Sequence, residues 1–138
     1  MSSETAMPRA IHAPDVTVGP SPGRGLGVFA GRGFAPNETI EVCPVIVLSE
    51  ADARRLDDTR LNEYYFGWGM DGKQAGIVLG YGSIYNHSFT PNAVHNKNAA
   101  NDTMVVVAVR EIAAGEEIFI HYETGKDGDE QPMWFEVR

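Results

Sequence analysis

Residues 85–92 read Tyr-Asn-His-Ser-Phe-Thr-Pro-Asn, and residues 115–123 read Gly-Glu-Glu-Ile-Phe-Ile-His-Tyr-Glu. Both stretches set several polar side chains between hydrophobic ones, which is unusual for strands that only pack in a core. Polar groups that become buried need hydrogen-bond partners. The two stretches therefore indicate a specifically built site, and the interpretation of the rest of the chain depends on them.

A glycine-rich stretch lies upstream of them, Gly-Arg-Gly-Leu-Gly-Val-Phe-Ala at residues 23–30. Gly25, Gly27 and Ala30 fit the dinucleotide fingerprint G-x-G-x-x-G/A, which requires a helix that begins inside the motif. Further glycines and a proline follow at once and argue against such a helix. Two interpretations remain open: an ordinary tight turn, or a turn whose backbone approaches a ligand closely.

Short β-rich runs alternate with glycine and proline along the chain. The sequence predicts strands over residues 16–18, 28–30, 39–42, 45–48, 77–79 and 104–109. One helix is expected over residues 51–56, with Ser49 as its N-cap. Residues 96–102 predict a hairpin loop, because a calcium loop would need more carboxylates than Asp102 alone. The predicted fold is one mostly β domain with few short helices, preceded by a disordered arm over residues 1–14.

Composition narrows the class of protein. The chain has 138 residues and 43% hydrophobic residues, enough for one domain with its own core. A net charge of -8 disfavours direct binding of nucleic acid and favours basic protein partners. Neither a secretory signal nor a membrane-spanning segment is recognised. With a single cysteine, Cys43, the chain is expected to be cytoplasmic.

The order of three motifs resembles that of SET-domain protein lysine methyltransferases, in a minimal single-domain form without flanking zinc clusters. The motifs are Gly-x-Gly at residues 25–27, Asn-His-Ser followed by Pro-Asn at residues 86–92, and Gly-Glu-Glu with a downstream tyrosine at residues 115–122. The resemblance assigns residues 15–125 to a catalytic domain and residues 126–138 to a C-terminal flap. It implies a SET-like β fold of short strands with a C-terminal pseudoknot.

The same resemblance implies an activity and a site. S-adenosylmethionine would be the methyl donor, no metal would be needed, and the acceptor would be a lysine of a protein, by charge a basic one. Tyr122 is the expected catalytic residue, and a homodimer is left open. The expected donor-binding residues are Gly25, Leu26, Gly27, Tyr85, Asn86, His87 and Tyr122. The expected substrate-channel residues are Tyr64, Tyr65, Phe66, Ile120 and Trp134.

Several residues depart from the family pattern, which leaves alternatives open. Phe89 stands where the family has cysteine, and His121 stands where it has aspartate. These departures allow a second hypothesis, a catalytically inactive SET-like module that binds a basic peptide. His121 could act as a base or lie on a surface strand, and each aromatic ring could equally belong to the core. Ile120 occupies the place where the family's aromatic residue limits methylation, so we expect room for more than one methyl group.

Overall fold

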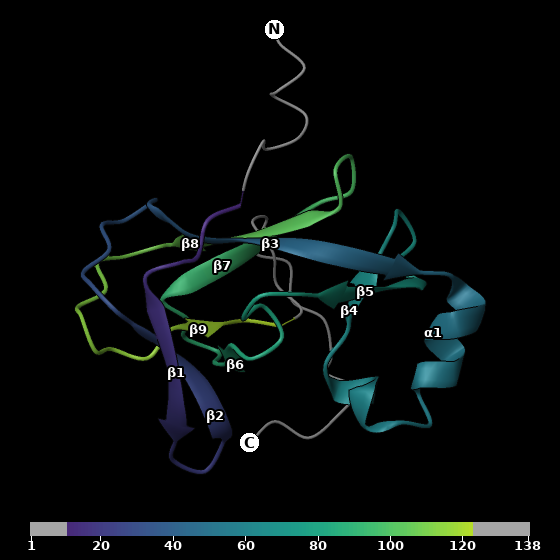
Figure 1. The fold of residues 1–138 in the computed structure, drawn as a ribbon, viewed down its shortest axis with the longest axis horizontal. Helices are drawn as coiled ribbons and strands as arrows, with labels where there is room; N and C mark the ends of the chain where they lie inside the picture. The colour runs from purple at the N-terminus through teal and green to yellow at the C-terminus, as the bar shows by residue number, and fades with distance from the viewer. Residues whose placement is uncertain (1–10, 123–138) are drawn as a thin grey trace, which may run out of the picture.

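In a computed structural model of the chain, residues 11–122 are described (Figure 1). Most of the predicted arm, the last residues of the predicted catalytic domain and the whole predicted flap, including Trp134, lie outside the described residues. The elements are, in chain order, β1 (Val16–Ser21), β2 (Gly25–Ala30), β3 (Thr39–Leu48), α1 (Glu50–Leu56), η2 (Arg60–Glu63), β4 (Phe66–Trp68), β5 (Gln74–Val78), β6 (Asn86–His87), β7 (Ala93–Asn98), β8 (Thr103–Ala108) and β9 (Phe119–Ile120). The prediction of a mostly β fold with few short helices is confirmed.

A five-stranded antiparallel sheet in the order β4-β5-β3-β8-β7 forms the body of the described chain. In Figure 1 the β1–β2 ribbon and α1 lie at opposite ends of this sheet. The buried core includes large side chains from β3, β4 and β8 and from the two polar-rich stretches. No helix within residues 11–122 is long and apolar enough to cross a membrane.

The two strands predicted on either side of Pro44 are one continuous strand, β3. Its first half pairs with β8 and its second half pairs with β5, and Pro44 lies where the partner changes. The neighbouring Val45 N–H donates to the Asp102 carbonyl at 3.0 Å, and the Pro44 carbonyl accepts from Leu79 N–H at 2.9 Å. Proline is tolerated inside a strand where no N–H is required of it. The sequence prediction was therefore wrong about a break at this position.

Local signals predicted the helix and the hairpin well. Ser49 caps α1, its hydroxyl accepting from Asp52 N–H at 3.1 Å. The predicted hairpin joins β7 to β8, but its loop is shorter than expected, because residues 96–98 still pair with β8. Asp102 closes the turn with a φ of 52°, a left-handed conformation that Asp and Asn adopt more readily than most residues.

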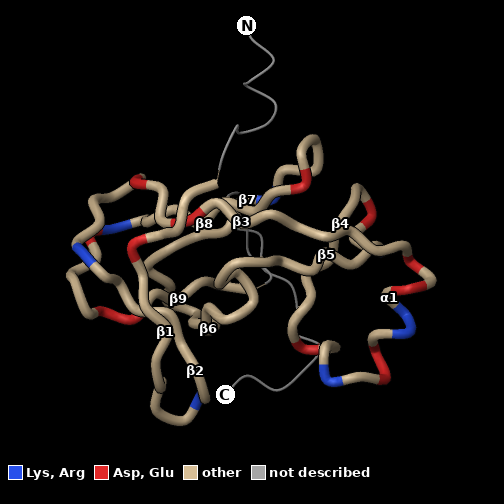
Figure 2. Tube along the Cα trace, viewed as in Figure 1, with Lys and Arg blue, Asp and Glu red and all other residues tan. Residues whose placement is uncertain are grey.

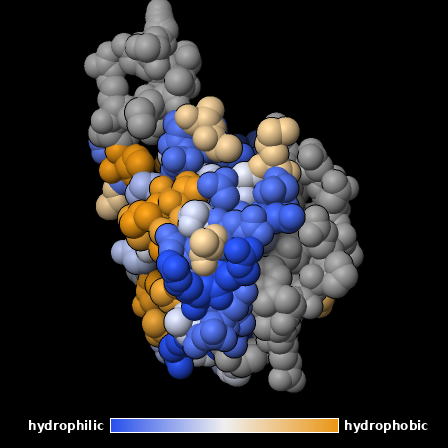
Figure 3. All heavy atoms as spheres, turned by 90° about the vertical axis from the view of Figure 1, so that its right-hand side faces the viewer, coloured by the Kyte–Doolittle hydropathy of each residue, from blue (hydrophilic) through white to orange (hydrophobic). Residues whose placement is uncertain are grey.

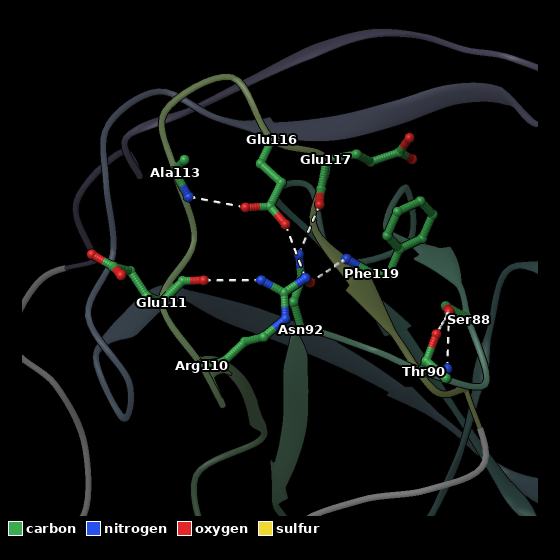
Figure 4. A network of polar contacts seen from close by, with 9 residues as sticks. All are labelled: Ser88, Thr90, Asn92, Arg110, Glu111, Ala113, Glu116, Glu117 and Phe119. Carbon is green, nitrogen blue, oxygen red and sulfur yellow. Dashed lines mark hydrogen bonds and ion pairs between the residues drawn. The ribbon is translucent and has the colours of Figure 1, made fainter.

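The two polar-rich stretches meet in a short parallel pair, β6 with β9, in the register Asn86↔Phe119 and His87↔Ile120. One buried side chain reinforces this pair: Asn92 Nδ2 donates to the Glu117 carbonyl at 2.9 Å, and Asn92 Oδ1 accepts from Phe119 N–H at 2.8 Å (Figure 4). The Asn92 amide thus satisfies a donor and an acceptor of the incoming strand. This contact between chain segments far apart in sequence is what the expected pseudoknot requires.

Replacing Asn92 by alanine should destabilise the fold, because two buried backbone groups would lose their partner. Each such group costs about 1–3 kcal/mol, so we expect a loss of roughly 2–4 kcal/mol in the free energy of unfolding. Urea denaturation followed by circular dichroism measures it. Asn98→Ala, which removes a single exposed loop hydrogen bond, is the matched control. Equal stabilities of the two variants would contradict the role of Asn92.

Candidate functional site

The turn at residues 25–27 owes its glycines to two different causes. Gly25 has a φ of 81°, which is costly for other residues, and open space lies where its Cβ would be. Gly27 is buried, and a Cβ there would lie 3.0 Å from Asn86 Nδ2 and from the carboxyl carbon of Glu117. Leu26, between them, exposes 58% of its surface. The turn therefore presents an open backbone on one side and packs against the two motifs on the other.

Asn86 and Glu117 connect this turn to β6 and β9. Asn86 Nδ2 donates to the Leu26 carbonyl and to Glu117 Oε2, both at 2.9 Å. Glu117 Oε1 accepts from the Ser21 hydroxyl at 2.8 Å. Asn86 was predicted as a donor-binding residue, and the structure gives its amide group a second task, which is to hold the glycine turn in place. The three motifs named from the sequence therefore form one hydrogen-bonded unit.

His87 is buried and holds the chain beside Tyr122. Its Nδ1 accepts from Tyr122 N–H at 3.1 Å, so in neutral His87 the proton lies on Nε2. That buried Nε2 finds no hydrogen-bond partner among the described residues. Burial, with repulsion from His121 and Arg24, lowers the pKa of His87 to about 4. His87 is thus a neutral N–H donor at pH 7, which leaves a buried donor without a partner at this site.

Tyr122, the predicted catalytic residue, donates its hydroxyl proton to the Tyr85 carbonyl at 2.8 Å. Its ring lies 5.2 Å from the His87 ring and meets the Phe66 ring edge-on at 6.4 Å. Because the only hydroxyl proton goes to Tyr85, the phenolic oxygen can interact with a further polar group only as an acceptor. The structure therefore gives Tyr122 a defined direction and a defined hydrogen-bonding role.

The side chain of Tyr85, a predicted donor-binding residue, points into the core. It is fully buried, and its hydroxyl donates to Glu41 Oε1 at 2.6 Å. Alternation along the chain sends Tyr85 into the core and its backbone carbonyl toward Tyr122. Only the backbone of Tyr85 can therefore take part in the site.

The predicted channel residues fall into different environments. Phe66 is buried at the start of β4 and contacts Tyr122. Tyr64 follows η2 as its C-cap rather than lying on a strand. The Tyr65 hydroxyl donates to Asp57 at 2.7 Å, and burial together with Asp57 raises its pKa to about 12. Ile120 is fully buried in the core cluster and opens onto no surface. Phe66 thus lies against Tyr122; a shared channel stays a prediction.

The two departures from the family pattern contact each other. The His121 ring lies 4.5 Å from the His87 ring and 5.2 Å from the ring of Phe89, which itself lies 4.4 Å from His87. His121 is buried, which overturns the idea that it lies on a strand surface. Phe89 and His121 thus build one aromatic cluster around His87. No group of three or more His, Cys, Asp or Glu within residues 11–122 is placed to hold a metal ion.

The model of the SET domain family matches residues 25–123, the span that contains all three motifs. The chain belongs to the SET domain family. A histone-lysine N-methyltransferase of Schizosaccharomyces pombe, described as specific for H3 lysine 37, is 37% identical over 82% of this chain and 71% of its own length.

Solved SET domain structures share the fold. A candidate histone methyltransferase of Plasmodium falciparum superimposes with a TM-score of 0.65 at 31% identity, covering 83% of this chain and 97% of its own. The Polycomb Repressive Complex 2 of Chaetomium thermophilum, in a structure bound to S-adenosylmethionine, superimposes with a TM-score of 0.67 at 19% identity. That match covers 85% of this chain but 16% of the other, so it supports the fold alone.

Sequence reasoning about this SET domain missed the residues that hold the site together. Glu117 was quoted in the third motif without a role, and Asn92 only as part of the second. Glu41 and Arg24 were not singled out at all. A signal was present for Glu117 and Asn92, since both are polar residues within hydrophobic surroundings. Glu41 also stands between hydrophobic residues, Ile40 and Val42. Strand alternation predicts an outward-facing side chain there, and its partners lie forty or more residues away in sequence.

The SET domain should lose stability as the pH falls below about 6.5, the ordinary pKa of histidine. His95 is buried against the Phe66 ring at 5.3 Å, and burial, with repulsion from Lys97 and His121, lowers its pKa to about 3. The unfolded chain therefore takes up protons between about pH 6.5 and 3 that the folded chain does not, which favours unfolding.

Melting temperatures at pH 7.5 and 5.5 measure this effect. The drop between the two values should be smaller in His95→Phe than in the wild type, and unchanged in the exposed-site control His12→Gln. An equal drop in all three proteins would contradict the assignment to His95.

Proposed function

We propose that this SET domain transfers a methyl group from S-adenosylmethionine to a lysine side chain of a basic protein. The observation that carries the proposal is the fixed acceptor geometry of Tyr122, with its hydroxyl on the Tyr85 carbonyl and its backbone N–H on His87. The Schizosaccharomyces pombe relative is named a histone-lysine N-methyltransferase, which supports lysine as the acceptor group.

The residues around the glycine turn fit the chemical groups of S-adenosylmethionine. Arg24 has a buried Nε without a hydrogen-bond partner, and its guanidinium stacks over the Phe119 ring at 5.1 Å. No ion pair of Arg24 is found within residues 11–122, and Figure 2 shows Lys/Arg colour at the start of β2. Arg24 would hold the carboxylate of the donor, His87 Nε2–H would donate to a ribose or adenine acceptor, and Gly25 and Leu26 would line the ligand.

The protein's part in the reaction is to position the amine and to favour its neutral form, with the ammonium proton lost to solvent before the methyl group is transferred. A free lysine amine has a pKa of about 10.4 and is protonated at neutral pH, and apolar surroundings such as Phe66 disfavour that form. The Tyr122 oxygen then accepts an N–H of the neutral amine and turns its lone pair toward the donor. Alignment of this kind can supply roughly 7–11 kcal/mol. Bound S-adenosylmethionine supplies the electrophilic methyl group.

The acidic character of the chain supports a basic substrate. The charge is not concentrated on α1, where Glu50 and Asp52 pair with Arg54 and Arg55 at 2.8 Å. Acidic and basic residues alternate there, and hydrophilic residues dominate that side of the molecule (Figures 2 and 3). We therefore assign the attraction to the net charge of the whole chain. Binding of nucleic acid is not part of the proposal.

The compartment and the assembly of the protein also stay proposals. We propose a cytoplasmic protein, which fluorescence microscopy of a tagged chain would test; concentration of the signal in a nucleus would contradict it. Homodimer formation is tested by sedimentation at several concentrations, where a single monomer mass throughout would exclude a dimer in that range.

Calorimetric titration with S-adenosylmethionine should give saturable one-site binding to the wild type. Arg24→Met should weaken that binding by about tenfold or more, because a charge-assisted hydrogen bond contributes roughly 1.5–3 kcal/mol. Arg60→Met, on η2, is the matched control and should bind like the wild type. A folded wild type that binds no donor would contradict the proposed function.

Tyr122→Phe should keep donor binding while turnover falls by roughly 100-fold or more, the scale of positioned proton and hydrogen-bond catalysis. Recombinant histone H3 serves as the probe substrate, and mass spectrometry counts the methyl groups, of which more than one is expected. Tyr81→Phe is the control and should retain turnover. Donor binding without turnover on H3 or other basic proteins, combined with binding of their peptides, would favour the inactive-module alternative.

A further inference from the structure

A buried carboxylate lies outside every motif used above. Glu41 on β3 exposes 4% of its surface. It faces inward because β3 shifts register against β8 between Thr39 and Glu41, so that both Ile40 and Glu41 point into the protein. No ion pair of Glu41 with a cationic side chain is found within residues 11–122. A buried carboxylate without a cation needs strong donors.

Those donors come from the segment that leads into β6. Glu41 Oε1 accepts from the Tyr85 hydroxyl at 2.6 Å, and Glu41 Oε2 accepts from Tyr81 N–H at 3.0 Å. Gly80 has a φ of 66°, and a Cβ there would collide with Glu41 Oε2. Residues 80–85 therefore wrap around the two carboxylate oxygens, and the short Tyr85 contact has the length of a charge-assisted bond.

The Tyr85 hydroxyl and the Cys43 thiol, which both lie near Glu41, keep their protons. Burial, followed by the charge of Glu41, raises the pKa of the Tyr85 hydroxyl above its usual value. Burial and Glu41 also raise the pKa of the Cys43 thiol. The Tyr85 hydroxyl therefore remains the donor of its bond to Glu41 over the whole working pH range.

The same tyrosine carries the acceptor of the catalytic hydroxyl. Glu41 fixes the Tyr85 side chain, and the backbone carbonyl of Tyr85 accepts from Tyr122 Oη at 2.8 Å. Three segments of the chain are thus linked in series: β3, the segment before β6, and Tyr122, the second residue after β9. The lone pairs of Tyr122 Oη can face an amine only while its O–H donates to the Tyr85 carbonyl. The position of that carbonyl therefore sets the direction in which Tyr122 Oη can accept a hydrogen bond.

We propose that Glu41 is a positioning residue for the methyl transfer, acting through Tyr85 on the hydroxyl of Tyr122. This inference rests on the proposed function and adds a residue that touches neither donor nor substrate. It explains why a charged side chain is kept in the core at a place where an apolar one would pack at lower cost.

Glu41→Gln tests the link with little change of volume. The amide keeps one acceptor oxygen, but it presents N–H to one of its two donors, so residues 80–85 must shift. We expect kcat on histone H3 to fall by about tenfold or more, since small misplacements of reacting groups cost up to about 100-fold. The affinity for S-adenosylmethionine, by calorimetry, should stay within about twofold of the wild type.

Tyr85→Phe breaks the same link from the other side and should lower kcat to a similar degree. The double variant Glu41→Gln/Tyr85→Phe should then be no slower than the slower single variant, because changes within one network do not add. Glu41→Asp, which keeps both acceptor oxygens, should recover part of the lost kcat. Fully multiplicative losses in the double variant would contradict a shared route.

A control separates positioning from stability. Ala53→Gly on α1 lowers the melting temperature without touching Glu41, Tyr85 or Tyr122. Below its melting transition it should keep the wild-type kcat. If Glu41→Gln also keeps the wild-type kcat, Glu41 only stabilises the fold and the inference is overturned.

A crystal structure of Glu41→Gln gives a readout that needs no activity. The distance from Tyr122 Oη to the Tyr85 carbonyl should exceed about 3.5 Å, beyond hydrogen-bond range, against 2.8 Å with Glu41 present. A retained bond would overturn the inference even if the enzyme is active. If the wild type binds no donor, the proposed function fails, whereas this distance still decides the role of Glu41.

Discussion

Everything in the candidate site depends on holding β6 beside β9. The parallel ladder between them is two residues long, far too short to be stable by itself. Additional stabilisation comes from polar side chains that form hydrogen bonds between the two motifs. Asn92 satisfies a carbonyl and an N–H of the incoming segment, Asn86 and Glu117 join it to the glycine turn, and His87 holds the backbone of Tyr122. The motif residues therefore act first as a scaffold, and the functional geometry results from it.

This arrangement explains why two unusual residues can be accommodated together. Phe89 and His121 stand where the family has cysteine and aspartate, and both rings pack on His87. In sequence they are two separate departures from a pattern. In space they form one cluster, in which an exposed aromatic ring covers a buried imidazole. The two departures thus change only how side chains pack around His87. The backbone of the two motifs stays paired.

The sequence predicted well those structural features that depend on neighbouring residues in the chain. Alternation of hydrophobic residues indicated most strands, Ser49 indicated the start of the helix, and the Asn- and Asp-rich stretch indicated the hairpin. Prediction from the sequence failed for features that depend on hydrogen-bond partners far away in the chain. The continuation of β3 through Pro44 depends on which neighbour supplies the next hydrogen bond. The inward face of Tyr85 and the role of Glu41 depend on a register shift and on a loop forty residues away. The order of the three motifs identified the family, because these motifs mark the site. It did not identify the side chains that support the site.

The long sequence separations across the site also govern when it can form. The Ser21 hydroxyl meets Glu117 over 96 intervening steps of the chain, and Asn86 meets it over 31. Contacts of this kind require closure of large loops and are slow to form compared with hairpins and helices. During synthesis, the large sheet can begin to pair while the segment that carries Tyr122 is still in the ribosome. The candidate site is then the last part of the domain to be completed, together with the part of the core that Ile112, Ile118 and Ile120 supply.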